Sequence, residues 1–296
     1  MAAMQKSAEG GLDTNLPPLP EHHPLCVGRP TAVLEVVVAA QTSAQRVCEA
    51  RTVRAAYPMK LLLPRTLASF QPGDGSSTGH VSVPTPIWAF VISYGGGVVA
   101  GDKLPLAVTV GTDATVVLSS QGSTKVFHAR GGAGGDASSG GDAAAGARAA
   151  VISTVASIAP GGLLAIVLDP LVCFARAVCV QATTVALAPG ASCVLLDWTC
   201  SGRRARGESW DFTHLELRTK LLEWRPPQPG AQAWMLHPVL SEACVLRASA
   251  AAPLPQRMGP AHVIGTLVLY GPRCVMCFIL HVRLLQDDVV CRVCAD

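Results

Sequence analysis

The glycine-rich stretch at residues 93–103, SYGGGVVAGDK, contains residue types that could bind a phosphate. A P-loop needs a lysine directly after its last glycine and a following helix, so that backbone N–H groups and the helix dipole meet the anion. In this chain Asp102 follows Gly101, and the next residues, LPLAVTV, are typical of a strand. The spacing of Gly95, Gly97 and Gly101 also departs from the G-x-G-x-x-G of dinucleotide-binding folds. We therefore expect a sharp hairpin connection between two buried strands.

Two C-x2-C pairs could hold a metal ion, and they consist of Cys274, Cys277, Cys291 and Cys294. Their spacing approaches that of a zinc ribbon, in which four thiolates form a closed tetrahedral site. Against this hypothesis, CVMCFILHV is typical of a buried strand, which would turn Cys274 and Cys277 to opposite faces. If zinc is bound, we expect it to be structural.

A hydrolytic triad could use Ser209, His214 and either Asp211 or Asp197. The serine lies in GESWD, which is not the G-x-S-x-G of a nucleophile elbow. A chain of this length contains such trios by chance, so we reject the triad.

Polar residues gather instead on three connections between expected strands, at 101–103, 121–125 and 201–212. The connection at 199–211 is long for a β domain, and long connections are often functional. Its charged residues Arg203, Arg204, Arg206 and Glu208 could equally pair with one another on a solvated loop.

Short runs of Val, Leu, Thr and Ala between turn residues must position these connections, and they indicate a mainly β fold. The runs lie at 33–38, 104–110, 114–120, 180–188, 191–198, 215–224 and 263–270. Strict alternation in FTHLELRTKLL (212–222) predicts one packed and one solvated face. Residues 241–250 are the best short helix candidate, and no internal repeat is evident.

Composition narrows the class of protein. The chain is 50% hydrophobic and 15% charged, which argues against disorder over most of its length. A net charge of +3 is too small to indicate nucleic-acid binding. The apolar window at 263–282 is interrupted by Gly271, Pro272 and Arg273, so it predicts two buried strands and not a membrane span.

The first twenty residues have no apolar signal region, so we expect a cytoplasmic protein. In that reducing compartment the eleven cysteines should be buried small hydrophobes or metal ligands, not disulfides. Residues 1–30 are expected to form a flexible arm, and 31–296 a single β domain. The Gly/Ala/Ser tract at 131–150 predicts a disordered insertion.

Four segments in this order resemble the urease accessory protein family UreD, also called UreH: 94–130, 163–177, 185–212 and 264–273. The glycine triplet ending in GD, the T-K-V-F motif and G-R-x-x-x-G-E (202–208) after a strand are jointly specific. The resemblance implies an irregular β-helical and sheet architecture with a few short helices. Family chains usually continue further, so residues 275–296 are a divergent and apparently shortened C-terminus.

The resemblance implies a scaffold and not an enzyme. Members bind apo-urease and the accessory protein UreF, through it the GTPase UreG, and help to insert nickel into urease; a homodimer within the complex is also expected. No cofactor is tightly bound, and Ni²⁺ is in transit through an internal channel. The alternative from the residues alone is a zinc-ribbon structural or interaction protein without a urease role.

Carried onto this sequence, the resemblance makes Asp102, Glu208 and His128 candidates for groups that line the path of the metal. Such a path needs oxygen or imidazole ligands that bind weakly. The alternative for both acids is a structural ion pair with Lys125 or Arg203. The residues expected to position the loops are Gly95, Gly96, Gly97, Gly101, Lys125, Gly202, Arg203, Arg206 and Gly207.

Overall fold

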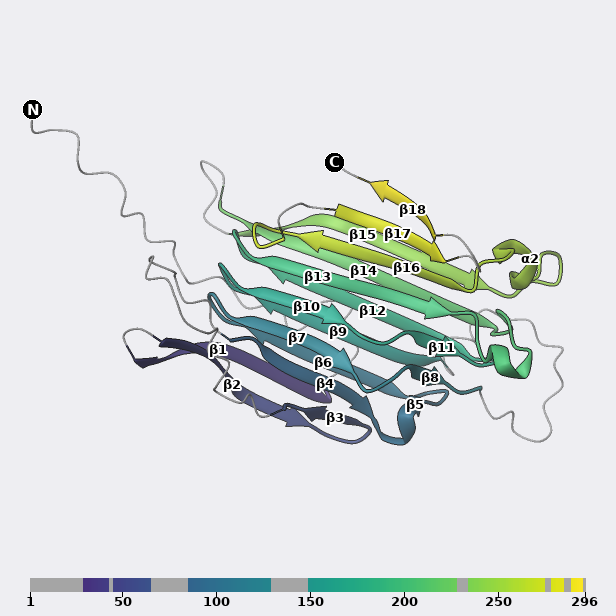
Figure 1. Cartoon of the computed structure of the whole chain (residues 1–296), viewed down its shortest axis with the longest axis horizontal. Helices are drawn as coiled ribbons and strands as arrows, with labels where there is room; N and C mark the ends of the chain where they lie inside the picture. Colours follow the sequence, from purple (N-terminus) through teal and green to yellow (C-terminus); the bar gives the residue numbers. More distant parts are fainter. Residues whose placement is uncertain are drawn as a thin grey trace, which may run out of the picture.

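The computed structural model describes residues 29–42, 45–64, 85–128, 149–227, 234–274, 278–284 and 289–294. These residues form two β-sheets, one lying over the other, with very few helical turns (Figure 1). The expectation of a mainly β fold is confirmed. Most of the expected arm at 1–30, the insertion at 131–150 and parts of the tail at 275–296 lie outside the described residues.

Sheet A has seven strands. In spatial order they are β15 (Met235–Arg247), β14 (His214–Arg225), β12 (Val178–Leu187), β9 (Ala150–Ile158), β6 (Lys103–Val110), β1 (Ala32–Thr42) and β2 (Gln45–Ala55).

Sheet B follows the order β18 (Val289–Cys294), β17 (Phe278–Leu284), β16 (Val263–Tyr270), β13 (Ser192–Cys200), β10 (Leu163–Val167), β7 (Thr115–Ser120), β4 (Ile87–Ser93) and β3 (Met59–Leu62). Three short strands branch from it: β5 (Gly97–Val98), β8 (Thr124–Val126) and β11 (Leu171–Cys173). The described helical turns are η1 (Tyr94–Gly96), η2 (Arg204–Arg206) and α2 (Leu254–Met258).

The central strands alternate between the two sheets. The chain passes from β6 in sheet A to β7 in sheet B, and continues through β9, β10, β12 and β13 before β14. The central neighbours within each sheet are parallel, as in β6–β9, β9–β12 and β7–β10, whereas outer pairs such as β1–β2, β14–β15 and β13–β16 are antiparallel. Parallel neighbours need crossover connections, and here each crossover uses a strand of the opposite sheet. This winding is the β-helical architecture that the resemblance implied.

Tight four-residue turns join the sheets at one end, which we call the turn end: residues 111–114, 159–162 and 188–191. They stack through backbone hydrogen bonds, since Asp113 N–H donates to Pro160 O at 3.1 Å and Gly161 N–H donates to Gly190 O at 3.2 Å. The backbone therefore repeats although the sequence shows no evident repeat.

The core lies between the sheets and is filled by alternate residues of each strand. On β14, Leu215, Leu217, Thr219 and Leu221 are buried, which confirms the alternation expected at 212–222. Burying an aliphatic side chain of this size contributes about 1.5–3 kcal/mol, so these rows hold the sheets together.

One expected element is wrong. Residues 241–250 were a helix candidate, but most of them belong to β15, which pairs with β14 from Met235 to Arg247. The weak helical tendency of this Ala- and Leu-containing segment is overridden by the pairing. The prediction of two strands at 263–282 is confirmed by β16 and β17.

The described cysteines are free thiols, and Cys48, Cys173, Cys179 and Cys193 are buried. This confirms, for these residues, the expectation of small buried hydrophobes and not disulfides. A hydrogen bond with Cys179, together with burial, raises the pKa of Cys173.

Substitutions on the two faces of β10 should differ in their effect on the free energy of unfolding, because one face is buried in the core and the other is exposed. Leu164 is fully buried and Val167 is 39% exposed. We expect Leu164→Ala to lower the free energy of unfolding by about 2–5 kcal/mol, and Val167→Ala to lower it by less than about 1 kcal/mol. Urea denaturation measures both, and equal losses would contradict the assignment of the two faces.

Candidate functional site

The long connections gather at the end opposite the turns, which we call the motif end: residues 94–102, 121–128, 168–177 and 201–213. A small parallel sheet holds them, because Lys125 pairs with Gly97 of β5 on one side and with Val172 of β11 on the other. Val172 in turn pairs with Cys200 of β13. Segments that are far apart in the sequence, and that carry the motifs noted above, thus lie side by side.

The glycine-rich segment is not a hairpin, so that expectation is wrong. It leads from β4 in sheet B to β6 in sheet A, and these strands have different neighbours. Gly95, Gly96 and Gly101 have φ values of 77°, 69° and 89°, which favour glycine. A side chain on Gly97 would collide with the backbone oxygen of Lys125 and the ring of Phe127. The glycines therefore permit the crossover and its close approach to β8.

Asp102 closes the end of this segment. Its Oδ2 accepts a hydrogen bond from Val99 N–H at 2.9 Å, and its own N–H donates to Val99 O at 3.1 Å. Its side chain is partly buried. The contacts give it a clear role in the turn, while a role in metal transit stays a prediction.

Glu208 forms an ion pair with Arg203, the structural alternative that the sequence left open. Arg203 Nε donates to Glu208 Oε2 at 2.9 Å, and Nη2 contacts Oε1. The hydrogen bond from Arg203 is the main cause that lowers the pKa of Glu208. The Arg203 guanidinium lies 4.0 Å from the centre of the Phe174 ring, and Phe174 packs edge-on against Phe127 at 5.1 Å. Side chains therefore join the T-K-V-F motif, through Phe174, to the 201–213 loop.

Two buried aromatic residues anchor the 201–213 loop to the core. Trp210 is 1% exposed and donates from Nε1 to Ala261 O at 2.8 Å. Phe212 is fully buried, with its ring centre 6.0 Å from that of Trp210. Gly207, at φ 78°, and Gly202, at φ 126°, allow the tight path between these anchors and β13.

The rejected triad has no support from the contacts of its residues. The Asp211 carboxylate accepts from Ser209 N–H at 2.9 Å, while His214 Nε2 faces Glu216 Oε2 at 3.7 Å. The other expected residues of the motif end, Lys125, His128 and Arg206, are exposed.

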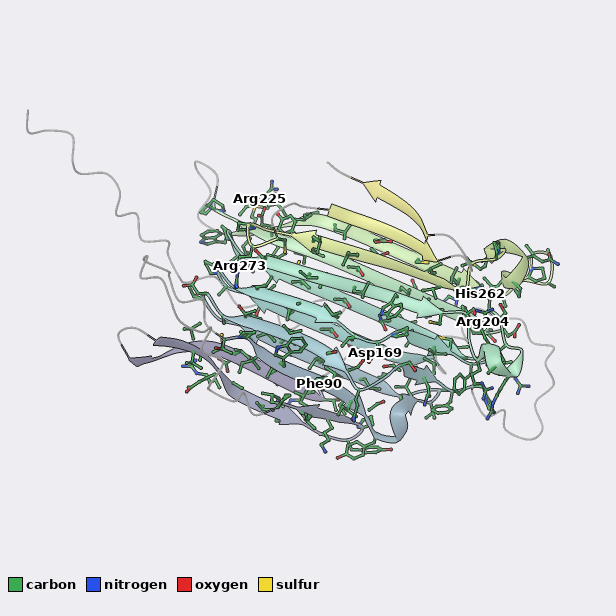
Figure 2. The ribbon with its side chains drawn as sticks, viewed as in Figure 1. Phe90, Asp169, Arg204, Arg225, His262 and Arg273 are labelled. Atoms are coloured by element: carbon green, nitrogen blue, oxygen red, sulfur yellow. The ribbon has the colours of Figure 1, made fainter. Side chains whose placement is uncertain are left out.

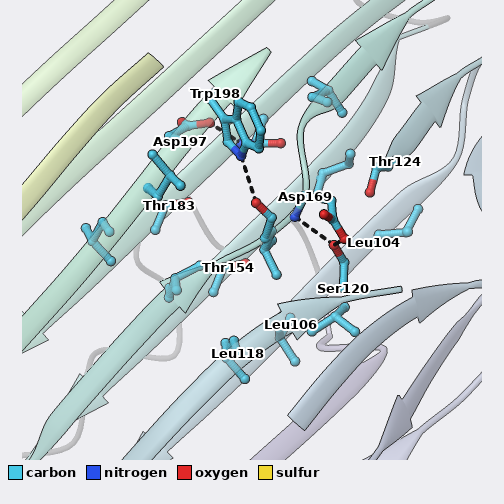
Figure 3. Close-up of a pocket in the computed structure, with 18 of the residues that line it drawn as sticks. Leu104, Leu106, Leu118, Ser120, Thr124, Thr154, Asp169, Thr183, Asp197 and Trp198 are labelled. Carbon is cyan, nitrogen blue, oxygen red and sulfur yellow. Dashed lines mark hydrogen bonds between the residues drawn. The ribbon is translucent and has the colours of Figure 1, made fainter. Parts of the chain in front are cut away.

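Two adjoining cavities lie between the sheets, and we call them together the interior passage. The first has a volume of about 80 Å³ and reaches Ser93, Thr124 and Asp169 at the motif end (Figure 3). The second, about 180 Å³, extends toward Glu242 on β15. Asp197 and Thr219 line both cavities, so the two cavities are neighbours on either side of these residues.

A polar row crosses the inner face of sheet A along the passage. Thr154 pairs with Thr183, Thr183 with Thr219 and Thr219 with Glu242, across four adjacent strands. On sheet B, Asp197 pairs with Thr266, whose hydroxyl donates to Glu242 Oε1 at 3.2 Å. Hydroxyls and carboxylates thus replace the aliphatic side chains that fill the rest of the core.

Asp197 is the most perturbed acid of the passage. Removal from water and the nearby charge of Glu242 raise its pKa to about 6, although Gln181 Nε2 donates to its Oδ1 at 2.6 Å. A buried carboxylate with a shifted pKa in a cavity is typical of a functional site.

At the motif end of the passage, Asp169 is held firmly. Its Oδ2 accepts from the Ser120 hydroxyl at 2.9 Å and from Gly122 N–H at 2.8 Å. Trp198 Nε1 donates to Leu168 O at 2.8 Å, which fixes the neighbouring backbone (Figure 3).

The expected path residues Asp102, Glu208 and His128 do not line either of these cavities. The acids that do line them were not predicted as path residues, although the sequence held one signal. In the β13 run, Asp197 occupies the inward register of Cys193 and Leu195. Glu242 was hidden because its segment was taken as helical.

Within the described ranges, no group of three or more His, Cys, Asp and Glu side chains gathers as a metal site. Cys277 lies outside these ranges, and of Cys291 and Cys294 only the backbone is described; the Cys274 thiol donates to Cys193 O at 3.5 Å. The structural zinc site stays a prediction. No described helix is both long and apolar enough to cross a membrane.

The fold and passage define a class of protein: a β-helical, two-sheet protein whose mostly apolar interior contains a row of hydroxyls and a few carboxylates. Comparison with known families is more specific, because the UreD urease accessory protein family matches residues 31–293. The chain belongs to this family. Membership favours the urease accessory role over the alternative without a urease role.

Similar proteins carry the same description. The urease accessory protein UreD of Sorangium cellulosum is 38% identical over 189 residues, which cover 63% of this chain and 50% of that protein. Urease accessory protein D of Arabidopsis thaliana is 28% identical over 73% of this chain and 61% of its own length. Urease accessory protein D of Oryza sativa subsp. japonica is 27% identical over 86% of this chain and 71% of its own length. The chain thus spans about half to two thirds of the length of the first two.

Because of its ion pair, we expect the contribution of Glu208 to the free energy of unfolding to depend on pH. Because Arg203 lowers the pKa of Glu208 below 4.5 in the fold, its stabilisation is present above that pH and disappears as the pH falls through the folded value. Glu208→Gln should lower the free energy of unfolding by about 1 kcal/mol at pH 7, and by progressively less as the pH falls below 4.5. Thermal unfolding of the variant and of the exposed control Glu49→Gln tests this; a pH-independent difference would contradict it.

For Asp197 we expect the opposite dependence of the free energy of unfolding on pH. Its pKa is raised from 3.8 to about 6, so the folded state holds the extra proton and stability falls as the pH rises between these values. Asp197→Asn keeps an acceptor for Gln181 but removes the charge. At pH 8 it should raise the free energy of unfolding by on the order of 2 kcal/mol, with little change at pH 4. Urea denaturation at both pH values measures the effect, and destabilisation at pH 8 would count against it.

Proposed function

We propose that this chain is a non-enzymatic scaffold that binds apo-urease and a UreF-like accessory protein, and a UreG-like GTPase through the latter. The assembly inserts Ni²⁺ into the urease active site. Family membership supports the role, and the pair Asp197 and Glu242, facing each other across the sheets, is the observation that carries the chemistry.

In this proposal Ni²⁺ is cargo and moves along the interior passage. Carboxylate and hydroxyl oxygens bind a borderline cation less tightly than a set of thiolates would, so they let it leave again. Asp169 is the acid that the ion meets at the motif end, and Asp197 and Glu242 form the next transient binding site. The threonine hydroxyls between them replace part of the hydration shell of the ion.

Co-expression with the matching urease and accessory proteins tests this function. Without the chain, urease should remain low in nickel and activity. Asp197→Asn with Glu242→Gln should lower the nickel content of urease at least about tenfold, the scale seen when groups that tune a metal site are lost. Both substitutions preserve side-chain size, and pull-down of the complex checks that assembly is intact.

The matched control is Asp102→Asn with Glu208→Gln, two acids outside the passage. If only this control lowers nickel transfer, the path runs near the motif loops, as the sequence indicated, and the passage assignment is wrong. If urease gains normal nickel without the chain, the accessory function itself is wrong.

A further inference from the structure

Four exposed cations project from the motif end without an ion pair to any described residue: Lys125, Arg176, Arg204 and Arg206. Figure 2 shows Arg204 at this end of the sheets. Lys125 extends from β8, and Arg176 follows β11, the strand paired with β8. Arg176 N–H also donates to Asp211 O at 2.9 Å, which ties its loop to the one that carries Arg204 and Arg206.

The acids at the same end are engaged by the protein itself. Asp102, Asp169 and Asp211 each accept from a backbone N–H, at 2.9, 2.8 and 2.9 Å. Glu208 is occupied by Arg203. The negative charges are therefore directed into the loops, while the four cations are directed outward.

These cations stand on a preorganised support. The loop bearing Arg204 and Arg206 is closed by the Arg203–Glu208 ion pair and anchored by buried Trp210. A side chain presented from a fixed loop loses less conformational entropy on binding than one from a mobile loop. Arginine is also among the residues enriched at the energetic centres of protein interfaces.

An exposed aromatic pair extends the same surface. Tyr57 is 80% exposed and Tyr94, in the glycine-rich segment, is 57% exposed; their ring centres are 5.6 Å apart. Tyr94 N–H donates to Pro58 O at 2.9 Å, which fixes the two segments together. Val99, in the same segment, is 50% exposed. Tyrosine and arginine are both enriched at protein interfaces.

We propose that the motif end is a docking surface for a carboxylate-rich patch on a partner protein. Arg176, Arg204 and Arg206 pair with its acids, and Tyr57 and Tyr94 supply apolar contact at the edge. The inference rests on the proposed function, because the partner is a protein of the urease assembly. Docking there places the partner over the end of the passage lined by Ser93, Thr124 and Asp169.

Binding of the purified full chain to purified apo-urease and to the UreF-like protein, each at about 50 and 300 mM NaCl, tests the inference. For at least one partner, Arg204→Glu with Arg206→Glu should weaken binding about tenfold or more at low salt and flatten the salt dependence. Tyr94→Ala should speed dissociation, with little change in salt dependence. Melting temperatures check that each variant is folded.

The control is Arg225→Glu with Arg273→Glu, two exposed cations at the turn end with the same change in net charge (Figure 2). The docking surface is overturned if the control weakens binding equally, or if neither salt nor the Arg204/Arg206 charge reversal changes binding. Neither result would contradict the accessory function. Failure of the unaltered chain to bind either protein overturns both. A fluorescent single-stranded RNA 20-mer is the remaining probe. The proposal is also overturned if Arg204→Glu with Arg206→Glu abolishes binding of this RNA but leaves binding of the protein partners unchanged.

Discussion

The central constraint on this protein is that parallel strands cannot be joined by a tight turn within one sheet. The chain satisfies it by crossing to the other sheet after nearly every central strand, so each sheet serves as the connection for the other. Successive turns then stack at one end, and the longer crossings collect at the other. The separation of a regular turn end from an irregular motif end follows from this winding.

The sequence predicted the parts of this fold that depend on local pattern. Runs such as 104–110 and 191–198 became strands because their aliphatic residues fill a shared core. The partners of each strand could not be predicted, since a glycine-rich segment permits either a hairpin or a crossover. The helix expected at 241–250 failed because twelve partner pairs with β14 outweigh a weak local preference.

The candidate site was predicted in part. The motifs correctly marked the loops that come together, including the contact of Arg203 with Glu208. Asp197 and Glu242 escaped notice as path residues because they occupy strands, where sequence pattern is dominated by packing, whereas Asp169 lies in the connection between β10 and β11. Burying the charged form of Asp197 costs free energy, as its raised pKa indicates. The fold tolerates this cost because Gln181 and the threonine row supply polar neighbours.

The stacked turns also restrict how such a chain can vary in length. Each turn is hydrogen-bonded to the next coil, so an added residue there would shift the register of two sheets at once. The described crossings at the motif end are longer and differ in length from one another, although β5, β8 and β11 pair within them. A tag or label introduced by design should therefore disturb the fold most when it is inserted at residues 111–114, 159–162 or 188–191.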